Sequence, residues 1–322
     1  MTRVQVAPPL KLVLLGLSAA GNLVACGTTE LQPIHQPISD DAESAPRSAP
    51  DAAYTGVDAA GDAGADAASA PCKRGIAANA APSAALAPTA SSPGVSWWSN
   101  WTTQGSGGDP RVEYVPMIWG SGSLSATIPA DARYLLGFNE PNFKSPQANL
   151  TVPQAIADWP AVEARAAGIP IVSPSVNFCG SSSDPSGCSD PAITDPYTYL
   201  KDFLSGCSGC KVDYIGVHAY MCDLPSLRAY LEGNLQSGGT LQGFLQFGRP
   251  IWLTEFACNA SHSVADQKAF MLAAVPYLES NPNVMRYAWF SAKPIPNALL
   301  VNPDGSLTDL GTTYVGLSEA CR

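Results

Sequence analysis

Two glutamates at the ends of apolar segments have the placement of catalytic residues. Glu140 ends an apolar segment at 134–140, and the Pro141 that follows it cannot continue a hydrogen-bonded strand. Glu255 ends a second apolar segment, Ile-Trp-Leu-Thr-Glu at 251–255. Two carboxyl groups that face each other make a glycosidase site, so we predict hydrolysis of a glycosidic bond. A single glutamate at a strand end is more often part of a salt bridge, but the pair makes that interpretation the weaker one.

The predicted reaction places demands on both carboxyl groups and on their neighbours. In a retaining glycosidase one carboxyl group protonates the leaving oxygen and the other attacks the anomeric carbon, at a separation of roughly 5–5.5 Å. The acid has to be neutral at the working pH, which requires burial or a nearby negative charge. We expect Asn139 to bind the sugar 2-hydroxyl, Tyr220 to orient the nucleophile and His218 to line the site.

Eight apolar segments recur from Cys72 onward and are predicted strands. They span residues 73–79, 95–101, 112–119, 134–140, 169–176, 212–220, 251–256 and 284–291. Predicted helices lie at 152–166, 197–204, 226–235, 264–278 and 313–321, because apolar positions recur there every three or four residues. Strands that alternate with helices indicate an α/β fold with parallel strands, and eight of them predict a (β/α)8 TIM barrel. The first three connections are short and helix-poor, which a compact barrel tolerates.

In such a barrel the carboxyl ends of all strands meet at one mouth. Beside the two glutamates, the substrate-binding candidates at these ends are Asn79, Trp98, Trp101, Trp119, Asn139, His218, Tyr220 and Trp289. Aromatic faces stack on pyranose rings, while amides and carboxylates bind hydroxyl groups. One tryptophan at a strand end is more often core packing, but several at equivalent ends favour a carbohydrate site.

The charge of the 322-residue chain is unevenly distributed. The formal net charge is −10, and the segment 27–71 alone has eight acidic residues and one basic residue among many Ala, Ser and Pro. Such a segment cannot bury enough apolar surface to offset chain entropy, so we predict a disordered tether before one catalytic domain at 72–322. The mildly acidic remainder shows no basic patch of the kind that neutralises phosphates, which argues against nucleic-acid binding.

The sequence pattern of residues 1–26 predicts the signal peptide of an exported lipoprotein. Arg3 and Lys11 precede an apolar stretch at 12–20, which is too short for a membrane-spanning helix. The sequence Leu-Val-Ala-Cys at 23–26 resembles the bacterial lipobox, in which the cysteine becomes lipid-modified. We therefore expect a lipid anchor at Cys26 and a location at the bacterial outer membrane or cell surface. The alternative is an ordinary signal peptide and a secreted protein.

Eight cysteines remain beyond the lipobox, an even number that favours disulfides in an exported chain. The pairs that we consider are Cys179 with Cys188, Cys72 with Cys321 at the two ends of the domain, and Cys207 with Cys210. The last pair could also be a redox or zinc pair, but we prefer a structural bridge. Only three histidines are present, so we predict neither a metal site nor a cofactor.

The motifs as a set resemble a known group of enzymes. The sequences Gly-Phe-Asn-Glu-Pro-Asn at 137–142 and Trp-Leu-Thr-Glu-Phe at 252–256 resemble clan A glycoside hydrolases. With Arg-Gly-Ile at 74–76, Trp-Trp-Ser-Asn-Trp at 97–101, Val-Pro-Met-Ile-Trp at 115–119 and Val-His-Ala-Tyr at 217–220, the set resembles glycoside hydrolase family 128, also described as the Asl1-like domain. The resemblance covers about residues 73–321. It implies a compact barrel that acts on β-1,3-glucans, with Glu140 as acid/base and Glu255 as nucleophile.

The sequence thus predicts a monomeric retaining endo-β-1,3-glucanase whose partner is a β-1,3-glucan polysaccharide or oligosaccharide. One alternative is another clan A glycanase that acts on xylan or mixed-linked glucan. The second alternative is a glucan-binding surface lipoprotein without turnover, which the presence of both glutamates disfavours.

Overall fold

The structure, a computed structural model, describes residues 73–233 and 243–317. They all belong to the second of two units of the chain, which spans residues 63–322. The predicted signal peptide with Cys26, the predicted tether and the possible pair of Cys72 with Cys321 lie outside the described residues.

Eight strands lie within the eight apolar segments that were predicted. They are β1 (Arg74–Ala77), β2 (Trp97–Ser99), β3 (Glu113–Tyr114), β4 (Leu135–Leu136), β5 (Ile171–Val172), β6 (Ile215–Ala219), β7 (Ile251–Phe256) and β8 (Val284–Phe290). Three strands have only two residues, and prolines limit the ladders of two of them, β3 and β5. Pro116, Pro170 and Pro174 lack the N–H that a longer ladder would require.

All pairings between the strands are parallel, and the neighbours run in a ring. Six strands pair in the order β3-β2-β1-β8-β7-β6, and β4 pairs with β5. Parallel bridges from Met117 to Leu136 and from Val172 to Tyr214 connect these two groups. The first strand also pairs with the last, with Ile76 opposite Trp289. The predicted α/β class is confirmed, and the ring of neighbours is the one expected of a barrel.

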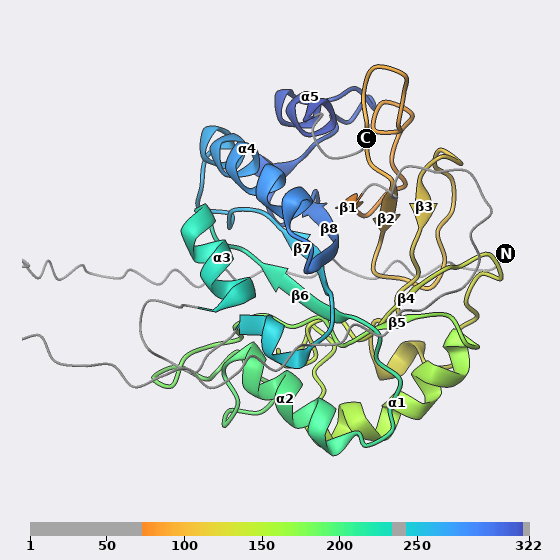
Figure 1. Cartoon of the computed structure of the whole chain (residues 1–322), viewed down its shortest axis with the longest axis vertical. Helices are drawn as coiled ribbons and strands as arrows, with labels where there is room; N and C mark the ends of the chain where they lie inside the picture. Colours follow the sequence, from red (N-terminus) through yellow and green to blue (C-terminus); the bar gives the residue numbers. More distant parts are fainter. Residues whose placement is uncertain (1–72, 234–242, 318–322) are drawn as a thin grey trace, which may run out of the picture. The chain divides into compact units, whose positions relative to one another are not determined.

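The helices lie outside the strands (Figure 1). They are α1 (Val152–Ala166), α2 (Pro196–Gly206), α3 (Leu224–Glu232), α4 (Val264–Ser280) and α5 (Asp309–Gly316), with 3-10 turns η1 (Ser121–Ser123), η3 (Gly243–Phe247) and η4 (Pro296–Ala298). The first three connections, between β1 and β4, contain only the 3-10 turn η1 and no α-helix, as was predicted for these short connections. None of the helices in the described part of the chain is both long and apolar enough to cross a bilayer.

Capping residues determine where the helices begin. Asp195 and Asp223 accept hydrogen bonds from backbone N–H groups at the starts of α2 and α3. The last helix was predicted at 313–321, but α5 begins earlier, at Asp309. Its start is fixed by the hydroxyl of Thr308, which accepts a hydrogen bond from the N–H of Gly311. This cap lies before the apolar pattern on which the prediction relied.

Close packing around β4 positions the segment that leads to Glu140. Trp159 of α1 is fully buried between Phe138 and Phe203, with ring centroids at 5.6 and 5.0 Å. Gly137 makes this approach possible, because a Cβ atom there would lie 2.8 Å from the carbonyl oxygen of Val172 and 2.9 Å from the ring of Trp159. The end of β4 is therefore held tightly against the helical layer.

Candidate active site

Glu140 lies just beyond β4 in an unusual backbone conformation. Its φ of 41° is in the left-handed region, which residues other than glycine rarely adopt. The N–H of Glu140 donates to the carbonyl oxygen of Ser175 at 2.8 Å, which ties the turn to the segment after β5. Residues held in such conformations cluster at functional sites, where the surrounding structure stabilises them. The residue in this conformation bears a buried carboxyl group that lines a cavity.

Glu255 comes from β7 and is held by two aromatic side chains. Its Oε1 accepts a hydrogen bond from Nε1 of Trp101 at 2.5 Å. Its Oε2 accepts a short hydrogen bond from the hydroxyl of Tyr220. Only 4% of Glu255 is exposed, so these donors replace the water that would otherwise solvate the carboxylate.

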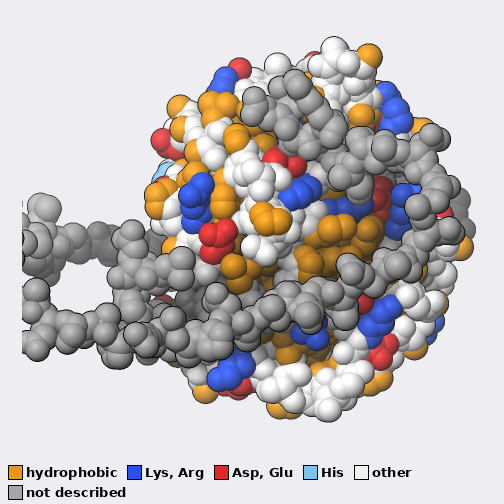
Figure 2. All heavy atoms as spheres, in the orientation of Figure 1, with side chains coloured by type: hydrophobic (Ala, Val, Ile, Leu, Met, Phe, Trp, Pro, Cys, Tyr) orange, Lys and Arg blue, Asp and Glu red, His pale blue; other side chains and the backbone are white. Residues whose placement is uncertain are grey.

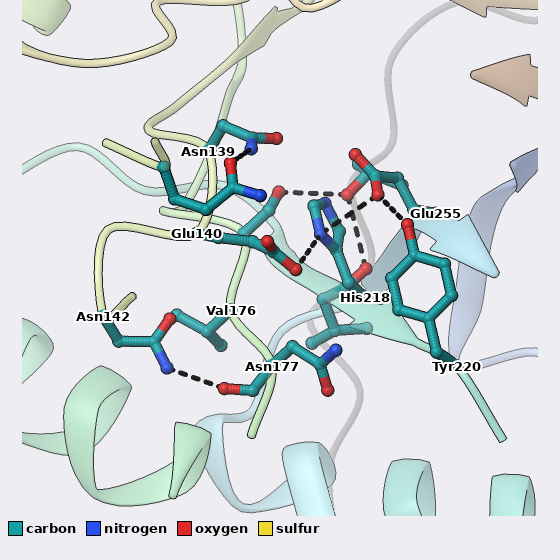
Figure 3. Close-up of polar contacts among 12 residues, drawn as sticks. Asn139, Glu140, Asn142, Val176, Asn177, His218, Tyr220 and Glu255 are labelled. Carbon is teal, nitrogen blue, oxygen red and sulfur yellow. Dashed lines mark hydrogen bonds and ion pairs between the residues drawn. The ribbon is translucent and has the colours of Figure 1, made fainter. Parts of the chain in front are cut away.

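His218 lies between the two glutamates (Figure 3). Its Nδ1 is 2.9 Å from Oε1 of Glu140 and 3.4 Å from Oε2 of Glu255. A shift of register between Val217 and His218 places the histidine opposite Glu255 in the pairing of β6 with β7. The imidazole is fully buried, so it contacts the carboxyl groups from behind rather than forming the wall of the site.

The buried charges shift the pKa values of these groups. Burial acts to lower the pKa of His218, but the negative charges of Glu255 and Glu140 and the hydrogen bond to Glu140 outweigh it, so the pKa is raised above 6.5. Burial raises the pKa of Glu255, and the charge of Glu140 acts in the same direction. His218, Tyr220 and Trp101 partly offset this rise by stabilising the carboxylate. Burial and the nearby carboxylates also raise the pKa of Tyr220, which keeps its proton.

A cavity of about 600 Å³ opens in front of the two glutamates. Its walls are formed by residues that follow several strands: Asn79, Trp101, Trp119, Asn139, Glu140, Gln147, Tyr220, Glu255, Asn259, Ala260, Phe290, Ala292, Pro294 and Ile295. Aromatic and amide side chains around two carboxyl groups are the lining that a sugar requires. The cavity is large enough for part of an oligosaccharide rather than for a small ion alone.

The structure brings together most of the residues that were predicted for the site. Asn79, Trp101, Trp119, Asn139 and Tyr220 line the cavity with both glutamates, and His218 lies directly behind them.

Two of the tryptophans that were predicted to bind substrate do not line this cavity, and these two predictions are corrected. Trp98 packs against Tyr114 and borders a separate cavity of about 570 Å³. Trp289 is fully buried, and its indole N–H donates to the carbonyl oxygen of Ala298. Successive side chains of a strand point to opposite faces, so the end of a strand does not bring every aromatic residue to the mouth.

Other residues of the cavity were missed in the sequence. Gln147 accepts a hydrogen bond at 3.0 Å from Nδ2 of Asn139. The Oδ1 atom of Asn139 is buried and has no partner among the described residues, so this amide can accept a hydrogen bond from a ligand. Phe290 ends β8 and lies one residue beyond the Trp289 that was chosen. Phe290 could have been identified by asking which face of the strand turns towards the cavity. Gln147 lies in a loop, where no sequence pattern marks it as part of the site.

Among the described residues, three disulfides join segments of the loops that follow the strands. Cys179 is bonded to Cys188 and Cys207 to Cys210, as predicted. The third bond joins Cys222 to Cys258 and was not foreseen. It connects the segments that follow β6 and β7, only two and three residues beyond Tyr220 and Glu255 respectively.

On the face drawn in Figure 2, the described Lys and Arg side chains lie among acidic, neutral and hydrophobic ones rather than in one basic patch. This agrees with the mildly acidic composition of the predicted domain.

The chain is similar to known proteins in sequence and in structure. A family model described as the glycosyl hydrolase catalytic core matches residues 75–314. The alkali-sensitive linkage protein 1 of Schizosaccharomyces pombe is 28% identical over 240 residues, which are 69% of this chain and 40% of the yeast protein. The chain thus matches less than half the length of that relative.

Solved structures give a closer likeness. An endo-β-1,3-glucanase of glycoside hydrolase family 128, subgroup II, from Sorangium cellulosum is 40% identical, with a TM-score of 0.62. The alignment covers 76% of this chain and 98% of that one. A subgroup I endo-β-1,3-glucanase from Amycolatopsis mediterranei, in complex with laminarihexaose, is 28% identical with a TM-score of 0.59, and covers 76% and 98% of the two chains.

Proposed function

The chain belongs to glycoside hydrolase family 128, and from this premise we propose that it is a retaining endo-β-1,3-glucanase. The observation that carries the proposal is the contact of one buried imidazole with two buried carboxyl groups, at the rim of an open cavity. Glu140 is the acid/base and Glu255 is the nucleophile.

The first step breaks the glycosidic bond and forms an ester. Oxygen of the Glu255 carboxylate attacks the anomeric carbon, while the carboxyl proton of Glu140 passes to the leaving oxygen. In the second step water attacks the same carbon, gives its proton to the Glu140 carboxylate and releases Glu255 as a carboxylate. Each cycle consumes one water and returns both glutamates to their starting states.

The separation of the glutamates supports the retaining course. Because the same nitrogen of His218 is 2.9 Å from an oxygen of Glu140 and 3.4 Å from an oxygen of Glu255, these two oxygens cannot be farther apart than about 6.3 Å. Inverting enzymes require roughly 6.5–9.5 Å between the two carboxyl groups so that a water fits beside the sugar. This limit on one pair of oxygens is compatible with the closer spacing of roughly 5–5.5 Å in retaining enzymes, in which the second carboxylate attacks directly.

The surroundings of the glutamates support their different roles. Glu255 accepts hydrogen bonds from Tyr220 and Trp101, and donors to a carboxylate favour its charged form, which a nucleophile needs. Asn139 adjoins Glu140 and has a free buried Oδ1, which can accept a hydrogen bond from the sugar 2-hydroxyl in the transition state. Such a bond contributes most when the ring flattens towards an oxocarbenium ion.

The choice of β-1,3-glucan rests on the two solved relatives described above, both of which are endo-β-1,3-glucanases. Trp119 on the cavity wall offers an aromatic side chain for a glucose ring. Cleavage within the chain, rather than from an end, is consistent with a cavity that is open to solvent.

The location of the enzyme is part of the proposal. A lipid on Cys26 would hold the barrel, as a monomer, at the outer membrane or cell surface through the tether at 27–71. The substrate would then be a glucan outside the cell. Secretion without an anchor is the alternative.

The test is to incubate the purified chain, with its disulfides formed, with linear β-1,3-glucan and to follow the products by chromatography. A ladder of short oligosaccharides is expected, and it should vanish in Glu140→Gln and Glu255→Gln. Glu163→Gln on the outer helix α1 is the matched control and should keep turnover. Products from xylan or mixed-linked glucan alone would overturn the substrate, and binding of glucan without products would indicate a binding protein.

A further inference from the structure

The indole N–H of Trp101 contacts the nucleophile rather than pointing to solvent. Nε1 of Trp101 lies 2.5 Å from Oε1 of Glu255, and among the described residues it is the donor to this oxygen. The other oxygen, Oε2, faces the hydroxyl of Tyr220 and Nδ1 of His218. Trp101 is therefore the residue that holds one side of the carboxylate, a role different from the stacking surface that the sequence predicted.

The backbone at Trp101 is held in a conformation that a bulky residue seldom adopts. Its φ is 62°, in the left-handed region. The turn is fixed on its two sides by side chains and backbone: Oδ1 of Asn100 accepts hydrogen bonds from Thr102 and Tyr114, and the carbonyl oxygen of Thr102 accepts one from the N–H of Met117. The neighbours thus maintain the strained turn that carries the indole to Glu255.

Phe290 connects the two aromatic donors of Glu255. Its ring packs against Trp101 at 5.6 Å between centroids and against Tyr220 at 5.5 Å, the latter nearly edge to face. Both donors therefore rest on one ring at the end of β8. A shift of either donor would disturb the other through this contact, so the position of the carboxylate is set from both sides.

We propose that Trp101 is a positioning residue for the nucleophile, whose indole N–H fixes the orientation of Glu255 and favours its charged form. The inference rests on the proposed function of Glu255. An indole is a donor only, and it does not give up its proton in the physiological range. It can therefore stabilise the carboxylate before the attack, and again as the ester is cleaved, without protonating it.

The indole N–H and the aromatic face of Trp101 should therefore contribute differently to the reaction. If Trp101 acts on Glu255, loss of its N–H alone should slow the attack on the anomeric carbon and leave the sugar-binding surface intact. A charge-assisted hydrogen bond of this kind typically corresponds to a change of about 10- to 100-fold in rate. If Trp101 acts by stacking, loss of the N–H should change little, because phenylalanine also offers an aromatic face.

The test compares Trp101→Phe with Trp119→Phe, which changes the other cavity tryptophan. For Trp101→Phe on β-1,3-glucan oligosaccharides we expect kcat to fall about 10- to 100-fold, KM to change less than about threefold, and the acid limb of the pH profile to move to higher pH. For Trp119→Phe we expect a change in KM and no movement of the acid limb. An unchanged acid limb with a raised KM in Trp101→Phe would overturn the proposal.

A second measurement does not depend on turnover. The carboxyl carbons of glutamate are labelled with ¹³C, the signal of Glu255 is assigned through Glu255→Gln, and its pKa is measured by NMR titration. The pKa in Trp101→Phe should be higher than in the unchanged chain, and equal values would refute the role. If the unchanged chain hydrolyses no glycan, the proposed function fails while this titration still decides what Trp101 does. Thermal unfolding of the variant confirms that it is folded.

Discussion

The Nδ1 atom of His218 lies 2.9 Å from Oε1 of Glu140, and both side chains are buried. The same nitrogen also reaches Glu255, so one imidazole faces two carboxyl groups that would otherwise repel each other. Two carboxylates in a buried site cannot both carry a full charge without compensation. The histidine therefore stabilises a site that needs two acidic groups close together.

This arrangement predicts a pH dependence of stability. The pKa of His218 is raised in the folded protein, so the stabilisation from its charged form is fully present below about pH 6.5 and is lost as the pH rises through the folded pKa. We expect the difference in free energy of unfolding between the unchanged chain and His218→Gln to be largest near pH 6 and to shrink towards pH 9. Urea unfolding at a series of pH values measures it, and a difference that grows with pH would contradict the charge compensation.

The two glutamates should respond differently to added azide. With an aryl glycoside, Glu140→Ala should still form the ester with Glu255, and azide should restore release of product with the β configuration. Glu255→Ala should lose about 10⁴-fold or more of its activity, and azide should there give the α product by direct attack. Product configuration is read by NMR. The same configuration from both variants would show that the roles are assigned wrongly.

The acid limb of kcat/KM should reflect ionisation of Glu255. Burial raises the pKa of this carboxyl above its ordinary value of 4.5, and the enzyme loses activity as the pH falls through the raised value, because a protonated nucleophile cannot attack. Tyr220→Phe removes a donor to the carboxylate and should move the limb to still higher pH. A limb at or below pH 4.5 in the unchanged chain would mean that another group controls it.

The bond between Cys222 and Cys258 should matter more for turnover than the other disulfides. Replacing both cysteines by serine frees the segments just beyond Tyr220 and Glu255, so we expect kcat to fall at least tenfold in addition to a stability loss of about 2–4 kcal/mol. The matched control replaces Cys179 and Cys188, which close a loop after β5. Thermal unfolding and initial rates separate the effects, and equal rates in both double variants would refute the prediction.

Packing at Gly137 should be intolerant of one added carbon. A Cβ atom there would come within 3 Å of the backbone of Val172 and of the ring of Trp159, so Gly137→Ala should cost about 1–3 kcal/mol of stability. Gly122→Ala is the control, because a Cβ atom at that position meets nothing within 4 Å. Chemical denaturation measures both variants. Equal stability would show that β4 can move away from α1 without loss.

Much of the fold could be predicted because apolar segments recur along the chain and polar residues follow at their ends. The eight strands, four of the helices and the two glutamates followed from this pattern. The helix at the C-terminus was placed too late, because the cap at Thr308 precedes the apolar repeat. Strand lengths were overestimated where proline removes a ladder donor, as at Pro116 and Pro170.

The remaining parts of the site depend on which way side chains point. Trp98 and Trp289 stand near strand ends, but only the three-dimensional register shows that their rings lie outside the cavity. The pairing of Cys222 with Cys258 requires knowledge that the segments after β6 and β7 adjoin. The donation from Trp101 to Glu255 depends on a left-handed turn at a tryptophan, for which the sequence offers no glycine or asparagine as a sign.

The pairing of β1 with β8 constrains the order of events during folding. Residues 74–77 pair on one side with residues 287–290, and the guanidinium of Arg74 donates to the carbonyl oxygen of Tyr314 at 2.8 Å. The first strand therefore has one open edge until the residues of β8 have been synthesised. Loop closure over such a separation is slow, so the barrel should assemble late and cooperatively, and truncation after α4 should leave a chain that cannot complete its ring.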